Sequence, residues 1–223
     1  MKESLERKSA KEIRWLASHK CTHRHTFINH PRCYNGLWKE RIGFLDIETE
    51  ALNADYGIIF SYCIKDNDSK KIYEDAITKD DIRKWGKVAQ EDTRLLRNLV
   101  RDMSNFDRLV GHFSSLFDLP FIRTRAVMCK VGYPEYGVYC QSDTWRILKT
   151  KFKLSRNSLE SGTRNLLGKT RKNHLSLKLK HGCLRGDRKS IEETLVHNRR
   201  DVLDTQDLFH ITFPFTKFNK SSI

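Results

Sequence analysis

The sequence predicts an α/β protein in which helices flank a mixed sheet, and two patterns carry that prediction. Three short apolar segments separated by turn residues come first, as in a strand meander: residues 41–47, 56–64 and 71–73. Helix and strand then alternate along the rest of the chain. A composition of 38% hydrophobic and 31% charged residues among 223 indicates a folded core rather than disorder.

The helices are predicted from apolar residues at helical spacing. Residues 3–19 form a short charged helix, and residues 89–103 place three leucines and a valine on one face. Arg108–Gly111 is expected to be a strand that leads into a helix beginning near Pro120. A last helix covers about residues 190–209. Its predicted buried face consists of Ile191, Leu195, Val202 and Phe209.

The expected organisation is an N-terminal helix with a Cys/His-rich extension over residues 1–40, a core domain over residues 41–213, and a tail over residues 214–223. No apolar run reaches the ~20 residues that span a bilayer, and the first eleven residues lack the apolar stretch of a signal peptide. We therefore expect a cytoplasmic monomer with access to the nucleoid or nucleus and no membrane partner. In that compartment the six cysteines should be thiols or metal ligands.

The net charge of +14 favours a polyanionic partner, and its distribution is uneven. Residues 146–189 hold fourteen Lys and Arg against two acids, Glu160 and Asp187, whereas a surface that serves solubility alone usually mixes the signs. The residues predicted to grip a nucleic-acid backbone are Lys151, Lys153, Arg156, Arg164, Lys169, Arg171 and Lys172. Trp145 and Phe152 are candidate stacking groups, with packing in the core as the alternative.

Asp46 and Glu48 alternate along the first predicted strand and therefore project from the same face as Phe44. Two carboxylates together at the end of an apolar strand are unfavourable unless protonation or a cation relieves their repulsion. A hard divalent cation explains the pair, and two solvated strand-end acids are the alternative.

Three further polar residues are candidates for the same site. Asp118 follows a strand and a small-residue turn and lies at the mouth of a helix, where capping is the alternative role. His197 and Asp201 are four residues apart in the last helix and project together at the margin of its apolar stripe. The alternative for this pair is an ordinary solvated surface.

Together these pieces resemble the DEDD superfamily of exonucleases, and within it the proofreading domains of family-B DNA polymerases and related stand-alone nucleases. Asp46 and Glu48 match the first motif, Asp118 the second and Asp201 the third, in the order of the family and over about residues 41–210. The segment from Asp143 to Leu159 is similar to the one that precedes the third motif. One position departs from the pattern. His197 lies four residues before Asp201, which is where the tyrosine branch of the family has a tyrosine.

The resemblance implies an RNase H-like fold and a two-metal 3′→5′ exonuclease. The four acids would hold two Mg²⁺ or Mn²⁺ ions, with Asp46 bridging both, Glu48 and Asp201 on the water-activating ion, and Asp118 on the second. His197 would orient or deprotonate the attacking water. The expected substrate is nucleic acid, with single-stranded DNA favoured over RNA.

A second metal site is predicted in the Cys/His-rich loop, where five possible ligands occur within thirteen residues. The predicted zinc ligands are Cys21, His25, His30 and Cys33, and the alternative is a loop whose histidines contact nucleic acid. Two other functions stay open. One is a zinc-stapled nucleic-acid-binding protein that does not cleave, which would have no use for clustered acids beside a phosphate groove. The other is an endonuclease or flap nuclease on the same fold.

Overall fold

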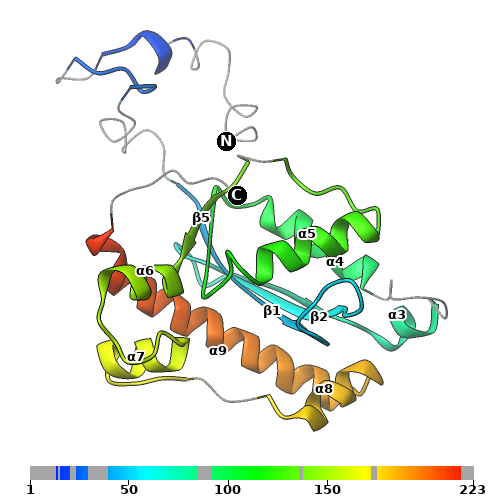
Figure 1. Cartoon of the computed structure of the whole chain (residues 1–223). Helices are drawn as coiled ribbons and strands as arrows, with labels where there is room; N and C mark the ends of the chain where they lie inside the picture. The colour runs from blue at the N-terminus through cyan, green and yellow to red at the C-terminus, as the bar shows by residue number, and fades with distance from the viewer. Residues whose placement is uncertain are drawn as a thin grey trace. The chain divides into compact units, whose positions relative to one another are not determined.

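The computed structural model describes residues 14, 16–20, 24–29, 40–84, 92–135, 138–171 and 175–216 (Figure 1). The chain divides into two compact units, residues 1–41 and residues 42–223. In the first unit, residues 14 and 16–18 are helical and Leu16 is buried. Most of the predicted helix over residues 3–19 lies outside the described residues.

The second unit contains the predicted mixed sheet. Its strands are β1 (Ile42–Thr49), β2 (Ile59–Asp66), β3 (Ile72–Ala76), β4 (Arg108–Gly111) and β5 (Cys140–Asp143). The spatial order is β3-β2-β1-β4-β5, with β1, β2 and β3 antiparallel and with β4 parallel to both β1 and β5. The meander is therefore confirmed, and β1 is the central strand.

Helices cover both faces of this sheet. Among the described residues they are α3 (Lys79–Lys84), α4 (Thr93–Met103), α5 (Asp118–Met128), α6 (Thr144–Lys151), α7 (Leu159–Leu167), α8 (Leu177–Leu184), α9 (Arg188–Thr212) and the 3-10 helix η2 (Phe213–Phe215). Figure 1 shows α4 and α5 on one face and the long α9, with α6, α7 and α8, on the other. No helix in the described ranges combines the length and the apolarity that a bilayer crossing requires.

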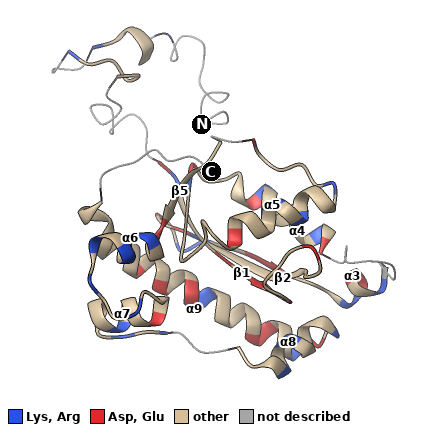
Figure 2. Ribbon diagram, in the orientation of Figure 1, with Lys and Arg blue, Asp and Glu red and all other residues tan. Residues whose placement is uncertain are grey.

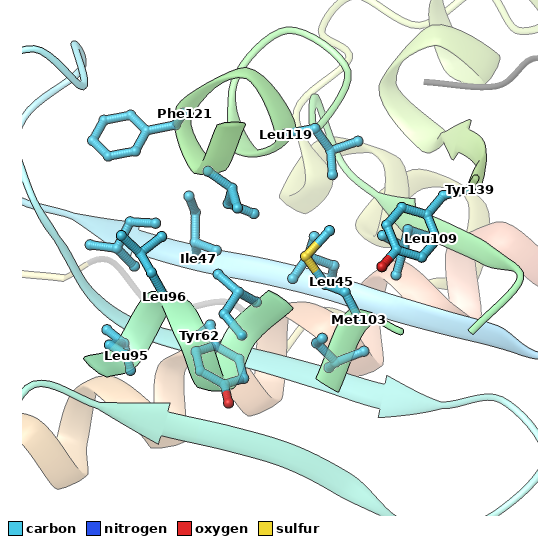
Figure 3. Close-up of a cluster of buried hydrophobic side chains, with 14 of the residues drawn as sticks. Leu45, Ile47, Tyr62, Leu95, Leu96, Met103, Leu109, Leu119, Phe121 and Tyr139 are labelled. Carbon is cyan, nitrogen blue, oxygen red and sulfur yellow. The ribbon is translucent and has the colours of Figure 1, made fainter. Parts of the chain in front are cut away.

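Alternation along β1 divides its side chains between the two faces. Leu45 and Ile47 belong to the larger core cluster, which packs against α4 and α5 (Figure 3). Phe44 packs in a second cluster with Val202 and Phe209 of α9. Because side chains alternate in a strand, Asp46 and Glu48 lie on the face that α9 covers.

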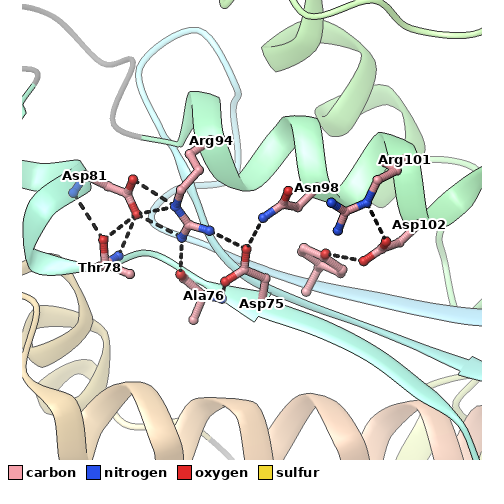
Figure 4. Close-up of polar contacts among 9 residues, drawn as sticks. Asp75, Ala76, Thr78, Asp81, Arg94, Asn98, Arg101 and Asp102 are labelled. Carbon is pink, nitrogen blue, oxygen red and sulfur yellow. Dashed lines mark hydrogen bonds and ion pairs between the residues drawn. The ribbon is translucent and has the colours of Figure 1, made fainter.

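Partly buried polar contacts attach α4 to the antiparallel half of the sheet (Figure 4). The Arg94 guanidinium donates to the Asp81 carboxylate at 3.0 Å and to the Ala76 carbonyl at 2.7 Å, and it also pairs with Asp75. Tyr62 of β2 donates to Asp102 at 2.7 Å. These bonds fix the edge strand β3 and its neighbour β2, so the sheet beneath the acids is rigidly supported.

A fully buried ion pair joins α5 to the start of α4. Arg125 donates from Nε and Nη2 to the two oxygens of Asp92, at 2.9 and 2.6 Å, and both side chains are 0% exposed. Asp92 also accepts the backbone N–H of Ile59 at 3.0 Å, at the first residue of β2. The pair therefore holds two helices and one strand together behind the candidate site.

Several sequence predictions need correction. The second strand begins at Ile59 rather than at residue 56, and Tyr56 lies in an exposed turn. The helix predicted to begin near Pro120 is α5, which begins two residues earlier, at Asp118. In α9 the predicted Ile191 and Leu195 are only half-buried. The buried positions of its first half are instead polar: Ser190, Thr194, His197, Asn198 and Asp201.

Candidate active site

The four predicted acids come together at one cavity. Asp46 and Glu48 project from β1, Asp118 is the first residue of α5, and Asp201 lies on the buried face of α9. They line a cavity of about 330 Å³ together with His112, Phe113, Lys180 and His197. Residues separated by up to 155 positions in the chain thus converge on the end of the central strand.

The local backbone explains why Asp118 faces this cavity. The last pair between β1 and β4 is Phe44 with Val110, so β1 continues beyond the end of its parallel neighbour. There the backbone N–H of Ile47 donates to Asp118 Oδ1 at 3.2 Å. The N-cap of α5 is Phe117, and no side chain caps the helix. Asp118 is therefore the first helical residue and an acid of the first turn, not the N-cap.

A register shift between β1 and β2 lies beside the second acid. The paired register changes between Glu48, opposite Ser61, and Thr49, opposite Ile59. Such irregularities bend a strand and re-aim its side chains, and they are common next to active sites. The strand end that carries Glu48 is thus bent at the rim of the cavity.

Helix α9 supplies the groups that orient the acids. His197 Nε2 lies 3.1 Å from Glu48 Oε1 and 3.7 Å from Asp201 Oδ2. Asn198 donates from Nδ2 to Asp46 Oδ2 at 2.6 Å and accepts from the Ser61 hydroxyl at 2.6 Å. His197 and Asp201 therefore lie on the buried face of α9 together with Asn198, and not at the margin of an apolar stripe as predicted.

Burial and mutual repulsion change the ionisation of two of the acids. Burial raises the pKa of Asp46 well above its usual value, and Asp201, Glu48 and Asp118 raise it further, against the hydrogen bond from Asn198. The pKa of Asp118 rises to about 7, mainly by burial, while its backbone hydrogen bonds oppose the rise. Lys180 of α8 brings a positive charge to 4.0 Å from Glu48. Both shifts favour the protonated forms of Asp46 and Asp118.

The donor set fits a hard divalent cation. Four carboxylates offer the oxygen ligands that Mg²⁺ and Mn²⁺ prefer, and a cation would offset the burial and the repulsion that raise the pKa of Asp46. Two of the acids already accept hydrogen bonds from the protein, Asp46 from Asn198 and Asp118 from the Ile47 N–H. Within the described ranges, no three His, Cys, Asp or Glu side chains are already arranged as a metal-binding group.

Asp143 organises the loop that forms another side of the cavity, and its role was missed from the sequence. Its Oδ1 accepts the backbone N–H groups of Phe113 and Trp145, both at 2.9 Å, and its Oδ2 accepts the N–H of Ser115 at 3.0 Å. The carboxylate caps α6 and holds the loop before Asp118. An acid just before a helical Thr-Trp pair is a capping signal that the sequence does contain.

Figure 2 shows Lys and Arg on α6 and α7, and of the predicted phosphate-binding residues Lys151 lies in α6 and Arg164 in α7. Lys151, Lys153, Arg156, Arg164 and Lys169 are exposed, and Lys172 lies outside the described residues. Two of the arginines already have acidic partners within the chain. Arg164 pairs with Glu160 at 2.6 Å, and Arg171 pairs with Asp204 at 2.7 Å and with Asp207 at 2.8 Å.

The aromatic candidates in this region differ in their surroundings. Phe152 is partly buried between two hydrophobic clusters and packs edge-on against Phe215, which supports its alternative role in the core. Trp145 is half-buried and packs edge-on against Phe113. Trp145 therefore supports Phe113, which lines the cavity.

Helix α8 carries basic residues that the sequence patterns did not single out. Lys180 faces the acids, whereas Lys178, His181 and Arg185 line a second cavity, of about 490 Å³, beside the start of α9. Of the predicted zinc ligands, His25 is exposed, and Cys21, His30 and Cys33 lie outside the described residues. Of the other four cysteines, Cys63, Cys129 and Cys183 are buried.

The fold and the site define a class: an RNase H-like α/β domain with a carboxylate pocket at the end of its central strand. A family model described as the RNase_H superfamily matches residues 43–212. The chain belongs to the RNase_H superfamily, as its resemblance to the DEDD exonucleases implied.

Among solved structures, the chain is similar to the family B DNA polymerase from the hyperthermophilic archaeon Pyrobaculum calidifontis, with a TM-score of 0.59 and 16% sequence identity. The match covers 79% of this chain and 25% of the polymerase, so the chain spans about a quarter of that protein's length. No curated protein sequence matches the chain. At this identity the similarity concerns the fold, which confirms the predicted α/β architecture.

Proposed function

We propose that the protein is a divalent-metal-dependent nuclease that hydrolyses phosphodiester bonds from the 3′ end of a nucleic acid, with single-stranded DNA as the favoured substrate. The observation that supports this proposal is the convergence of Asp46, Glu48, Asp118, Asp201 and His197 on one cavity. Membership of the RNase_H superfamily agrees with a nuclease. A protein that only bound nucleic acid would gain nothing from a buried group of acids that repels phosphate.

The four carboxylates would hold two Mg²⁺ or Mn²⁺ ions. Bound there, such ions supply Lewis-acid activation of a water molecule and neutralise charge on the departing oxygen. Asn198 keeps Asp46 oriented through its 2.6 Å hydrogen bond, and Ser61 fixes the Asn198 amide in turn. Asn198 is thus proposed as a positioning residue for Asp46.

His197 is proposed to take the proton of the attacking water. Its Nδ1 is buried, and the described part of the chain offers that atom no hydrogen-bond partner. Nε2 therefore exchanges the proton, because it faces Glu48 and Asp201 at 3.1 and 3.7 Å. The proton passes from water to Nε2 as the water oxygen bonds to phosphorus and the bond to the 3′ oxygen of the preceding nucleotide breaks.

Lys180 is placed to help bind the anionic substrate. Its ammonium lies 4.0 Å from Glu48 Oε2 and lines the same cavity. Once cations neutralise the carboxylates, that ammonium would be available to a phosphate oxygen. The exposed side chains of Lys151, Lys153, Arg156 and Lys169 remain the proposed contacts to the rest of the strand.

The test uses 5′-labelled single and double strands of DNA and RNA with Mg²⁺ or Mn²⁺. The wild-type protein should give a ladder of products that shorten one nucleotide at a time from the 3′ end. Asp46→Asn should give none, while Asp80→Asn, which removes an exposed acid of α3, should match the wild type. Cleavage of a circular single strand would instead identify an endonuclease, and binding without any product would identify a non-cleaving module.

A structural zinc ion at Cys21, His25, His30 and Cys33 is a separate proposal that rests on the sequence alone. A closed site of four such ligands would stabilise the N-terminal unit and take no part in hydrolysis. Elemental analysis of the purified protein should find about one zinc per chain, and Cys21→Ser with Cys33→Ser should remove it. Absence of zinc from the wild-type protein contradicts this proposal.

A further inference from the structure

Phe113 has an unusual backbone conformation for a bulky residue. Its φ is +65°, in the left-handed region that glycine and asparagine adopt far more readily than phenylalanine. The side chain is 39% exposed and lines the cavity that holds the four acids. A large apolar group in a strained conformation at a polar cavity calls for a functional explanation.

The surroundings of Phe113 enforce this conformation. Its N–H donates to Asp143 Oδ1 at 2.9 Å, and its carbonyl accepts the N–H groups of Leu116 and Phe117, both at 3.1 Å. Asp143 is itself buried and caps α6. The backbone of Phe113 is therefore fixed on both sides, and its ring is aimed before any ligand arrives.

The ring also has a firm aromatic support. Phe113 packs edge-on against Trp145, with ring centroids 5.0 Å apart and an interplanar angle of 80°. The Lys149 ammonium lies 4.6 Å from the centroid of the Trp145 ring and adds a positive charge nearby. Because the two rings are nearly perpendicular, Trp145 leaves at least one face of the Phe113 ring uncovered.

We propose that the ring of Phe113 stacks on the base of the nucleotide whose phosphodiester is cleaved, which makes Phe113 a substrate-binding residue. The inference rests on the proposed nuclease function. Stacking on an aromatic side chain tolerates every base, because each base has a π-face. The fixed geometry of the loop would then place the scissile phosphate beside the acids, with Asp143 as the positioning residue for the platform.

The test compares two single strands that differ only at the 3′-terminal nucleotide, which is normal in one and abasic in the other. Phe113→Ala should lower kcat/KM about tenfold or more on the normal strand and leave it unchanged on the abasic strand. Phe113→Tyr should restore the normal value. Leu116→Ala is the matched control, because Leu116 is an apolar residue of the same loop that is 49% exposed. This control should not alter the ratio of kcat/KM between the two strands.

Phe113→Gly removes the ring but suits the backbone conformation, so it separates an effect on substrate binding from an effect on folding. Glycine adopts a φ of +65° without strain, so this variant should keep the conformation of the loop and still lose the preference for the normal strand. An equal effect of Phe113→Ala on both strands would overturn the stacking role while the nuclease proposal stands. If the wild-type protein cleaves neither strand, both proposals are wrong.

Discussion

Replacing Asp118 by asparagine should stabilise the metal-free protein at neutral pH. Asparagine keeps the shape and can still accept the N–H of Ile47, but it carries no charge. The pKa of Asp118 rises from 3.8 to about 7 on folding. At 1.36 kcal/mol for each pKa unit, the ionised carboxylate reduces the free energy of unfolding by about 4 kcal/mol at most.

The sign follows from proton linkage. Near pH 4, Asp118 is protonated in the folded state and still about half protonated in the unfolded state, so the substitution should change little. As pH rises toward 7, the unfolded state loses this proton while the folded state retains it, so wild-type stability falls through that window. The advantage of Asp118→Asn should therefore grow from near zero at pH 4 to about 4 kcal/mol at pH 8.

Urea unfolding in EDTA from pH 4 to pH 8 measures this difference. Asp80→Asn is the control, since Asp80 is exposed and its substitution should show no such trend. Added Mg²⁺ should stabilise the wild type more than Asp118→Asn, because binding to the folded state adds to its stability. A variant that is less stable than the wild type at pH 8 in EDTA would refute the electrostatic account of the cavity.

Four further substitutions or conditions give sharp expectations. His197→Ala should lower kcat by about 10² to 10⁴ and leave Mn²⁺ affinity within a few-fold; unchanged turnover would remove its assigned role. Asn198→Ala should cost about 1 to 3 kcal/mol in urea unfolding, because Ser61 and Asp46 lose their partner. Arg125→Met leaves Asp92 buried and unpaired and should cost about 3 to 5 kcal/mol, with normal kcat per folded molecule. Strand binding measured by fluorescence anisotropy should weaken at least about tenfold from 50 to 200 mM salt, and a flat salt response would exclude a phosphate-binding surface.

Sequence periodicity predicted those features of the site that are set within a single strand or helix. Alternation along β1 was enough to place Asp46 and Glu48 on one face, and the apolar run before Asp118 was enough to predict β4. The helical repeat predicted that His197 and Asp201 project together. The predicted position at the margin of the apolar stripe was wrong, because a helical repeat of apolar residues does not reveal a buried face made of polar residues.

The remaining features depend on contacts between distant segments, which local patterns do not encode. Asn198 reaches Asp46 across 152 positions, and Lys180 approaches Glu48 from a helix of eight residues with little amphipathic pattern. The strained φ of Phe113 results from its bonds to Asp143, thirty positions away. Short helices such as α7 and α8 begin at serine caps, a signal weaker than a long apolar stripe.

The central claim is that one carboxylate cluster both binds divalent cations and cleaves nucleic acid. Mn²⁺ binding, followed by electron paramagnetic resonance, and strand cleavage should be measured in the same titration for wild type and Asp46→Asn. We expect the cleavage rate of the wild type to rise in step with bound Mn²⁺ and Asp46→Asn to lose both. Undiminished cleavage by Asp46→Asn, or cleavage by the wild type with no Mn²⁺ bound, would contradict the claim.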